Sequence, residues 1–156
     1  MVRLNGYSTV VDNNGNIFFC DDKGIFSVDP EGQLRWKYLA NIDSRDITID
    51  YNGNIYVSLW ISGTQPLLFS FDNDGNIRWQ LDISELGHVT SSLICDYEGT
   101  IHYASNSGVY AISSDGEINW KILIGENGWN CPALAHHFLF VGTWFRGPGR
   151  EFYCIN

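Results

Sequence analysis

Histidine, cysteine and acidic side chains are the residues of this chain that could bind a metal or catalyse a reaction. The candidates are four histidines and four cysteines: His88, His102, His136, His137, Cys20, Cys95, Cys131 and Cys154. No two cysteines form a CxxC pair, and their spacing is not typical of a metal site. The chain has no GxSxG, HExxH or phosphate-binding glycine loop. The sequence therefore predicts a protein that is not an enzyme, with no catalytic residue, metal or cofactor.

Two short segments, DNNGN at 12–16 and DNDG at 72–75, are rich in the oxygen ligands that calcium prefers. A twelve-residue calcium loop also needs a bidentate acid at its end, and none stands there. Asn or Asp before Gly is what a tight hairpin requires, because its backbone adopts positive φ. We interpret both segments as turns. His102 is expected to lie in a strand, either packed or exposed at an edge, and His136 and His137 to occupy a turn.

The chain contains a repeat with a period of about 40 residues. Three tryptophans, Trp36, Trp79 and Trp120, end similar segments and stand 43 and 41 residues apart. A second echo precedes each of them, in DNNGNIFF from 12, DYNGNIYV from 50 and DYEGTIHY from 96. Short alternating apolar runs separated by Asn-Gly, Asp-Gly and Glu-Gly turns predict antiparallel strands. Four such strands in 40 residues are typical of one propeller blade.

The first repeat predicts strands at 8–12, 16–20, 25–28 and 33–38, with Leu34 and Trp36 on one face by alternation. We predict an all-β, small β-propeller of about four four-stranded antiparallel blades, forming one domain over 1–156. The units cover 8–39, 46–83, 91–124 and 130–156, and the last lacks a closing strand. We expect residues 1–5 to supply that strand and close the ring. Two half-rings pairing into an eight-bladed dimer are the alternative.

The tryptophan segments resemble the docking motif of the pyrroloquinoline-quinone (PQQ) enzyme repeat, found in quinoprotein-type β-propellers. The pattern [Ser/Ala]-x-[Asp/Ser]-x-x-Gly-x-x-x-Trp matches at 27–36, 70–79 and 111–120, without the usual threonine before the glycine. The resemblance implies that Trp36, Trp79 and Trp120 pack between neighbouring blades. Enzymes of that family have about eight blades, a calcium-bound quinone and adjacent cysteines, and this chain has no adjacent cysteines. The resemblance therefore supports the fold and not the activity.

Charge and hydropathy narrow the range of partners. The net charge is −9, which argues against nucleic acid or anionic lipid and favours a basic protein. No apolar run approaches the roughly 20 residues of a membrane span, and the first residues do not resemble a signal peptide. We expect a cytoplasmic protein with reduced, mostly buried cysteines.

Hairpin turns and longer loops of a propeller emerge on opposite edges. The turn edge, made of the Gly turns between first and second and between third and fourth strands, holds ten of the eighteen acids. The loop edge is irregular, with long loops at 59–66 and 143–149. Aromatic and Arg side chains that break the repeat anchor protein interfaces. The predicted partner-binding residues on this edge are Trp60, Trp129, Trp144, Phe145, Arg146, Asp43, Asp46, Glu85 and Glu126. The alternative is that these aromatic side chains plug the central channel.

These features favour a non-enzymatic, protein-binding propeller. The specific hypothesis is an inhibitor or immunity protein that neutralises a basic toxin such as a nuclease, with opposite charge speeding association. A generic assembly scaffold and a propeller that binds a sugar or small molecule are the alternatives. A fragment of a quinone-dependent enzyme is a further one.

Overall fold

The fold was analysed in a computed structural model. It describes residues 8–39, 46–60, 65–87, 92–105, 107–123, 131–136, 138–142 and 152–155. The chain divides into two compact units, residues 1–83 and 84–156, which are described separately. Within the described residues the only helix is one 3₁₀ turn, and no helix is long and apolar enough to cross a membrane.

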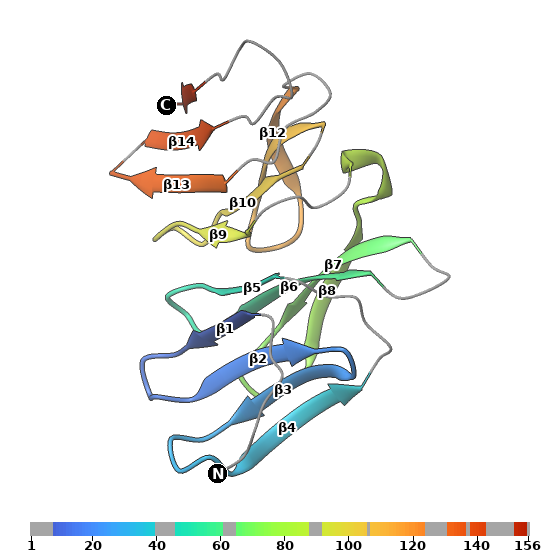
Figure 1. The fold of residues 1–156 in the computed structure, drawn as a ribbon, viewed down its shortest axis with the longest axis vertical. Coiled ribbons are helices and arrows are strands. Elements are labelled where there is room, and N and C mark those ends of the chain that lie inside the picture. The colour runs from blue at the N-terminus through green and yellow to red at the C-terminus, as the bar shows by residue number, and fades with distance from the viewer. Residues whose placement is uncertain are drawn as a thin grey trace. The chain divides into compact units, whose positions relative to one another are not determined.

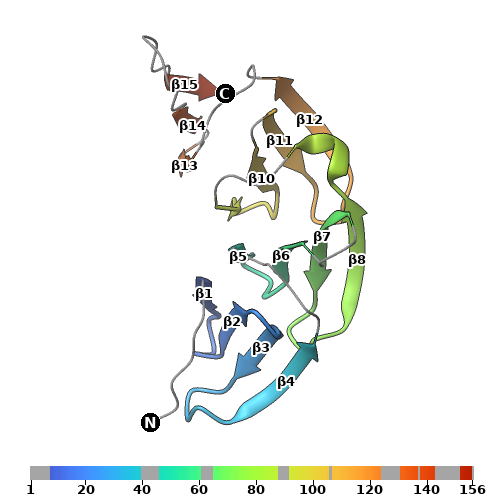
Figure 2. The ribbon, with the colours of Figure 1, turned by 45° about the vertical axis from the view of Figure 1, so that its right-hand side comes forward.

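The first unit contains two four-stranded antiparallel sheets, blades 1 and 2, each in simple chain order (Figure 1). Blade 1 consists of β1 (Ser8–Val11), β2 (Ile17–Asp21), β3 (Gly24–Val28) and β4 (Leu34–Leu39). Blade 2 consists of β5 (Asp46–Ile49), β6 (Ile55–Trp60), β7 (Pro66–Phe71) and β8 (Ile77–Asp82). Figure 2 shows β4 and β8 as the long last strand of each sheet.

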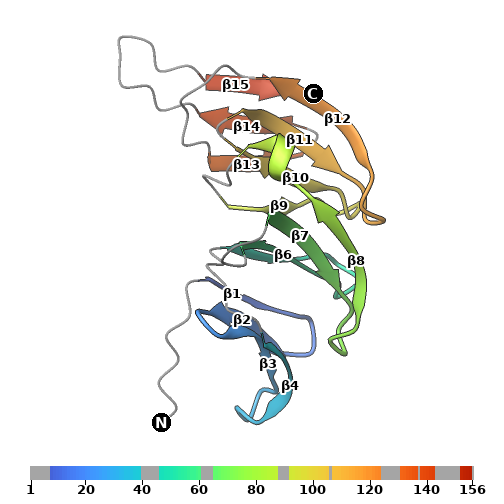
Figure 3. The same ribbon diagram turned by 90° about the vertical axis from the view of Figure 1, so that its right-hand side faces the viewer.

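The second unit begins with the 3₁₀ turn η1 (Ser84–Leu86) and contains blades 3 and 4. Blade 3 consists of β9 (Ile94–Cys95), β10 (Ile101–Ala104), β11 (Gly108–Ile112) and β12 (Ile118–Leu123). Blade 4 consists of β13 (Cys131–Ala135), β14 (Phe138–Gly142) and β15 (Phe152–Ile155), which lie in this order (Figure 3). Its sheet therefore has three strands among the described residues.

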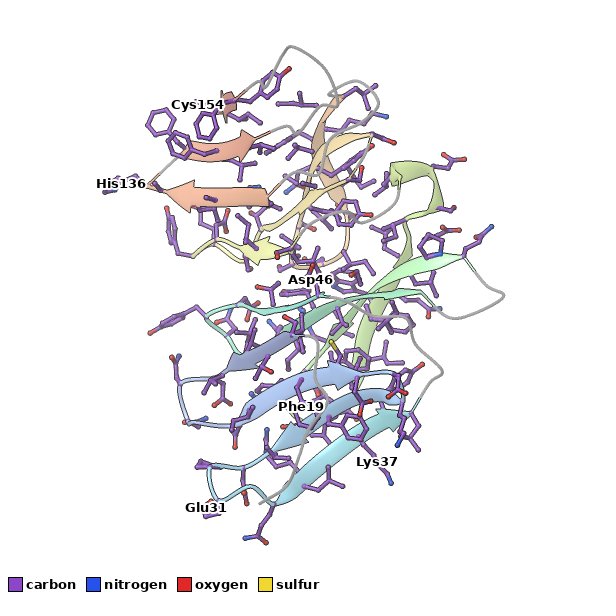
Figure 4. The ribbon with its side chains drawn as sticks, viewed as in Figure 1. Phe19, Glu31, Lys37, Asp46, His136 and Cys154 are labelled. Carbon is purple, nitrogen blue, oxygen red and sulfur yellow. The ribbon has the colours of Figure 1, made fainter. Side chains whose placement is uncertain are left out.

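The structure confirms the predicted all-β fold of antiparallel blades. The single domain over 1–156 and the bounds of its units stay predictions. His136 lies in the tight β13–β14 turn, as expected, with φ of 55° (Figure 4). Closure of the ring by residues 1–5 lies outside the described residues and stays a prediction. The cysteine expectation is wrong in part: Cys20 is buried, but Cys95 is half-buried and Cys154 is exposed.

Hairpin turns in blades 1 to 3 share one design, in which an Asp or Ser before the turn binds the turn backbone. In blade 1, Oδ1 of Asp12 accepts hydrogen bonds from the backbone N–H of Asn14 at 2.9 Å and Asn16 at 2.8 Å. Gly15 has a φ of 82°, which a residue with a side chain rarely adopts. The carboxylate oxygens thus hold the turn, as the sequence interpretation of these segments expected. No cluster of potential metal ligands occurs among the described residues.

Each outer hairpin of blades 1 to 3 contains a β-bulge, which corrects one expectation. Ser27 pairs with Trp36 and Val28 pairs with Leu34, so Arg35 is an extra residue in β4. The extra residue interrupts the alternation. Leu34 is therefore exposed while Trp36 is half-buried against the core, and the two do not share a face.

Each unit has its core between its two blades. In the first unit, Phe18 and Ile25 of blade 1 pack with Ile55, Val57 and other buried residues of blade 2. In the second, Ala104 and Val109 of blade 3 pack against Leu139 and Val141 of blade 4. Burying each such side chain stabilises the fold by about 1.5–3 kcal/mol, so blade pairing is the main source of stability in either unit.

Candidate functional site

A half-buried guanidinium lies beside the docking tryptophan in blade 1. Nη1 of the bulge residue Arg35 donates to Oγ of Ser27 at 3.0 Å, and Nη2 donates to Oδ1 of Asn73 in blade 2 at 2.8 Å. Its Cζ lies 5.8 Å from the ring centre of Phe18, in a cation–π contact. Arg35 thus joins the two blades with its charge largely shielded from water.

Blade 2 repeats the arrangement with its own bulge residue. Nη1 of Arg78 donates to Oγ of Ser70 at 2.9 Å and lies 3.4 Å from the hydroxyl of Tyr56. That hydroxyl donates to Oδ2 of Asp50 at 2.9 Å. Burial and the Asp50 charge raise the pKa of Tyr56 well above its usual range. An Arg at the bulge, a Ser opposite and an aromatic ring are common to both blades.

Blade 3 keeps the backbone of this arrangement but not its cation. Its bulge residue is Asn119, which is exposed, and the position opposite Trp120 holds Ala111 in place of Ser. The ring position is taken by His102, which pairs with Ala111 in the sheet. Blade 3 therefore has neither the guanidinium nor the hydroxyl that binds it.

A cavity of about 200 Å³ lies beside His102 and Trp120 in the second unit. Its lining comes from blades 3 and 4: Asp96, Tyr97, Glu98, His102, Trp120, Leu134, His136, Leu139 and Ile155. Two carboxylates and two large aromatic rings line one space, an arrangement suited to an organic cation.

His102 is the most buried polar residue of the cavity lining, with 6% of its surface exposed. Its Nε2 lies 3.1 Å from Oδ2 of Asp96, so Nε2 carries the hydrogen. Its Nδ1 is buried and has no hydrogen-bond partner among the described residues. The imidazole ring centre lies 5.9 Å from that of Trp120. The ring is thus oriented by Asp96 and forms part of the aromatic wall.

A tyrosine stands at the rim of the cavity. Tyr97 is 73% exposed, and its hydroxyl donates to Oε1 of Glu98 at 2.8 Å. This hydrogen bond and the charge of Glu98 raise the pKa of Tyr97. The equivalent turn of blade 2 has Tyr51, which is 80% exposed, whereas blade 1 has Asn13. Because all three turns have the same backbone hydrogen bonds, the turn itself does not require a tyrosine.

Sequence reasoning missed this cavity and its rim. The signal was present in the third repeat, where EINW replaces the QLRW and NIRW of the others and so loses the arginine before the tryptophan. The missing arginine could not be interpreted from the sequence, because only the structure shows that Arg35 lies half-buried between two blades.

Most of the predicted partner-binding residues fall outside the described part of the chain. Asp46 begins β5 and is half-buried, and Glu85 lies exposed in η1, in the other unit. The backbone of Trp60 ends β6. The remaining ones lie outside the described residues: Asp43, Glu126, Trp129, Trp144, Phe145 and Arg146. The proposed loop-edge contact therefore stays a prediction.

The three docking tryptophans occupy equivalent places in their blades. The ring of Trp36 lies 6.1 Å from that of Phe71 in the next blade. Trp120 packs on the core between blades 3 and 4, and Trp79 lies 5.8 Å from the ring of Tyr56.

Comparisons with known proteins support the fold alone. A scan of protein-family models and a search of curated proteins find no match. Solved β-propellers are similar in structure. Streptogramin B lyase has 12% identity and a TM-score of 0.70, over 95% of this chain and 54% of that protein. The gluconolactonase XC5397 of Xanthomonas campestris has 17% identity and a TM-score of 0.60, over 86% and 52%.

A solved domain whose name describes no enzyme has a comparable structural similarity. The Pan2 WD40 domain of Neurospora crassa has 13% identity and a TM-score of 0.64, over 95% of this chain and 46% of that one. The chain spans about half the length of these solved proteins. Propellers of mixed function share the fold, so the function must be argued from this chain's own residues.

Proposed function

We propose that this protein is a non-enzymatic propeller that binds a basic protein and takes one of its Arg or Lys side chains into the cavity between blades 3 and 4. One observation carries the proposal. Two residues of the cavity lining, His102 and Trp120, take the repeat positions of Phe18 and Trp36, beside which Arg35 lies in blade 1, and blade 3 has Asn119 in place of that arginine. The partner's cation would replace the one that this repeat lacks.

The cavity lining supports a cation chemically. Asp96 and Glu98 supply carboxylates, which form the strong, charge-assisted hydrogen bonds that a guanidinium prefers. Trp120 offers a ring face beside them, as Phe18 does for Arg35. Leu134 and Leu139 form an apolar wall that the methylene groups of Arg or Lys can cover.

Charge and exposed aromatics support a protein as the bearer of this cation. The net charge of −9 would speed association with a basic partner at low salt. Tyr97 at the rim is of a type enriched at interfaces, and Glu98 holds its hydroxyl. An exposed aromatic that the turn does not need is consistent with such a contact.

The proposal extends to the kind of partner. An acidic protein that covers a cation on a basic toxin, such as a nuclease, would act as an inhibitor or immunity protein in the cytoplasm. A generic assembly scaffold is the alternative, with Trp60, Trp144 and Arg146 on the loop edge as the second candidate surface. We also propose that the blades are related to PQQ-type repeats.

Calorimetric titration with a short acetylated and amidated Gly-Arg-Gly peptide tests the cavity directly. The matched probe carries citrulline, which has nearly the shape of arginine and no charge. We expect saturable binding of the arginine peptide, weakened by salt, and none of the citrulline peptide.

Three variants locate the site. Glu98→Gln should weaken binding, and Asn119→Arg should abolish it, because the chain then fills the cavity itself as Arg35 does in blade 1. Glu31→Gln is the control, since Glu31 is an exposed acid of an equivalent type of turn but does not line the cavity. Equal binding of both peptides, or unchanged binding by Asn119→Arg, would contradict the proposal. Binding of a sugar in place of the peptide, with the aromatic rings stacking on it, would favour the sugar-binding alternative.

A further inference from the structure

An aspartate begins the turn between the first and second strands in each of blades 1 to 3. These residues are Asp12, Asp50 and Asp96, and one oxygen of each, Oδ1, binds the turn backbone. In blade 3, Oδ1 of Asp96 accepts from the backbone N–H of Glu98 at 3.0 Å and of Thr100 at 2.8 Å. The three turns differ at the other oxygen, Oδ2.

In blades 1 and 2, two side-chain donors bind this second oxygen. Oδ2 of Asp50 accepts from Nδ2 of Asn54 at 2.7 Å and from the hydroxyl of Tyr56 at 2.9 Å. Oδ2 of Asp12 accepts from two side-chain amides at 2.8 and 2.9 Å, and the first of them is Asn16. A carboxylate oxygen has two lone pairs, so both acceptor positions of Oδ2 are used in these blades.

In blade 3, one donor binds Oδ2 of Asp96 among the described residues. This donor is Nε2 of His102, at 3.1 Å. The second donor is missing because Thr100 takes the position of Asn16 and Asn54 and has no amide N–H. The Asp96 side chain is 23% exposed and lines the cavity, so a ligand can reach it. Oδ2 of Asp96 therefore offers one open acceptor position to a ligand.

Two more acceptors of the cavity lining have no donor in the described part of the chain. Nδ1 of His102, a residue with 6% of its surface exposed, is buried and unpaired. At the rim, Oε1 of Glu98 accepts from the hydroxyl of Tyr97, and no described residue donates to Oε2. A buried acceptor without a donor is costly, and a ligand N–H can satisfy it directly or through a water. The lining therefore favours a ligand with several N–H donors.

From these open acceptors we infer that the cavity selects arginine over lysine, and that Oδ2 of Asp96 is the acceptor that distinguishes the two. The inference rests on the proposed function, because it concerns the same cation in the same cavity. A planar amide N–H2 group already binds the equivalent oxygen in blades 1 and 2. A guanidinium N–H2 group has the same planar shape and would take that place in blade 3.

The chemistry of the two cations explains the selectivity. A guanidinium is planar and carries five N–H donors, so it can donate to Asp96 and Glu98 while its face lies against Trp120. A lysine ammonium is a compact and strongly hydrated charge with three donors, and it lacks the planar fork. Lysine would keep the attraction of the two carboxylates but would match the open acceptors less well.

Calorimetric titration with two peptides tests the selectivity. The probes are acetylated and amidated Gly-Arg-Gly and Gly-Lys-Gly, which carry the same charge. We expect the native chain to bind the arginine peptide about tenfold more tightly than the lysine peptide, a difference of about 1.4 kcal/mol.

Thr100→Asn tests the role of Asp96, because it restores the asparagine that blades 1 and 2 have at this position. Its Nδ2 should donate to Oδ2 of Asp96, as Asn54 donates to Asp50. We expect it to weaken the arginine peptide about tenfold and to leave the lysine peptide nearly unchanged. Thr100→Val is the matched control, because valine has nearly the shape of threonine and brings no N–H, so it should keep the selectivity. Thermal melting checks that both variants fold.

The outcomes separate this inference from the proposed function. If the native chain binds both peptides equally, the cation site stands and the inference is wrong. The inference is also wrong if folded Thr100→Asn binds the arginine peptide as tightly as the native chain does. If the native chain binds neither peptide, the proposed function fails and the inference fails with it.

Discussion

Trp36 and Asn73 connect two blades through one hydrogen bond. The indole Nε1 of Trp36 donates to the backbone carbonyl oxygen of Asn73 at 2.8 Å, across the boundary between blade 1 and blade 2. Nδ2 of Asn73 in turn donates to Oδ2 of Asp12 at 2.9 Å. The tryptophan of blade 1 is therefore hydrogen-bonded to the outer turn of blade 2. That turn is also hydrogen-bonded to the first turn of blade 1.

Replacing Trp36 should separate its hydrogen bond from its packing. Trp36→Phe keeps most of the ring contact with Phe18 and Phe71 but removes the donor, and should cost about 1 kcal/mol in the free energy of unfolding. Trp36→Ala also leaves a cavity and should cost about 3 kcal/mol, the lower end for large-to-small changes because the ring is half-buried. Urea unfolding measures both. A loss below about 1 kcal/mol for Trp36→Ala would show that this tryptophan does not dock the blades.

Two equivalent turn glycines should respond differently to alanine. Gly32 and Gly75 have φ of 83° and 87°, so each substitution strains the backbone by about 1 kcal/mol. A Cβ on Gly32 would meet no atom within 4 Å, whereas one on Gly75 would lie 2.6 Å from Cδ2 of Trp36. Gly75→Ala should therefore lower the melting temperature clearly more than Gly32→Ala. Equal shifts would mean that the indole moves aside at no cost.

Asp12 should make stability depend on pH in the acid range. Burial raises its pKa, but the hydrogen bonds from Asn16, Asn73 and the turn backbone outweigh burial, and the pKa falls below the ordinary 3.8. Its carboxylate therefore stabilises the fold fully above that value, and the stabilisation is lost as pH falls through the lowered pKa. Asp12→Asn should be less stable than the native chain at pH 7 and should approach it near pH 2.

Urea unfolding at these two pH values measures the difference, with Asp22→Asn as the control because Asp22 is an exposed acid of the same blade. A constant gap between Asp12→Asn and the native chain from pH 7 to pH 2 would show that the Asp12 charge does not contribute.

Deletion of residues 1–5 tests the predicted closing strand. The sheet of blade 4 has three strands among the described residues where the other blades have four, and Val2 and Leu4 alternate as an outer strand would. We expect their loss to expose the edge of β15 and to remove two apolar side chains worth roughly 1.5–3 kcal/mol each. Thermal melting followed by circular dichroism measures this. An unchanged melting temperature would rule out that role for the segment.

The strands could be predicted from the sequence because period-2 alternation and Gly turns are local signals. The bulge at Arg35 could not, since it depends on how β4 pairs with β3, and so the shared face of Leu34 and Trp36 was predicted wrongly. The cavity was out of reach for a related reason. In the sequence Asn119 is an ordinary polar residue. Only the structure shows that it takes the bulge position at which Arg35 joins two blades.

Heteronuclear NMR during titration with the Gly-Arg-Gly peptide tests the proposed cation site most directly. We expect the indole Nε1–H signal of Trp120 and the amide signals of Tyr97, Glu98 and His136 to shift together and to saturate. The amide signals of Gly32 and Gly75, in turns of the other unit, should stay in place. Shifts confined to the indole signals of Trp60, Trp129 and Trp144 would place binding on the loop edge. If the Trp120 signal also stayed unchanged, the result would contradict the cavity between blades 3 and 4 as the binding site.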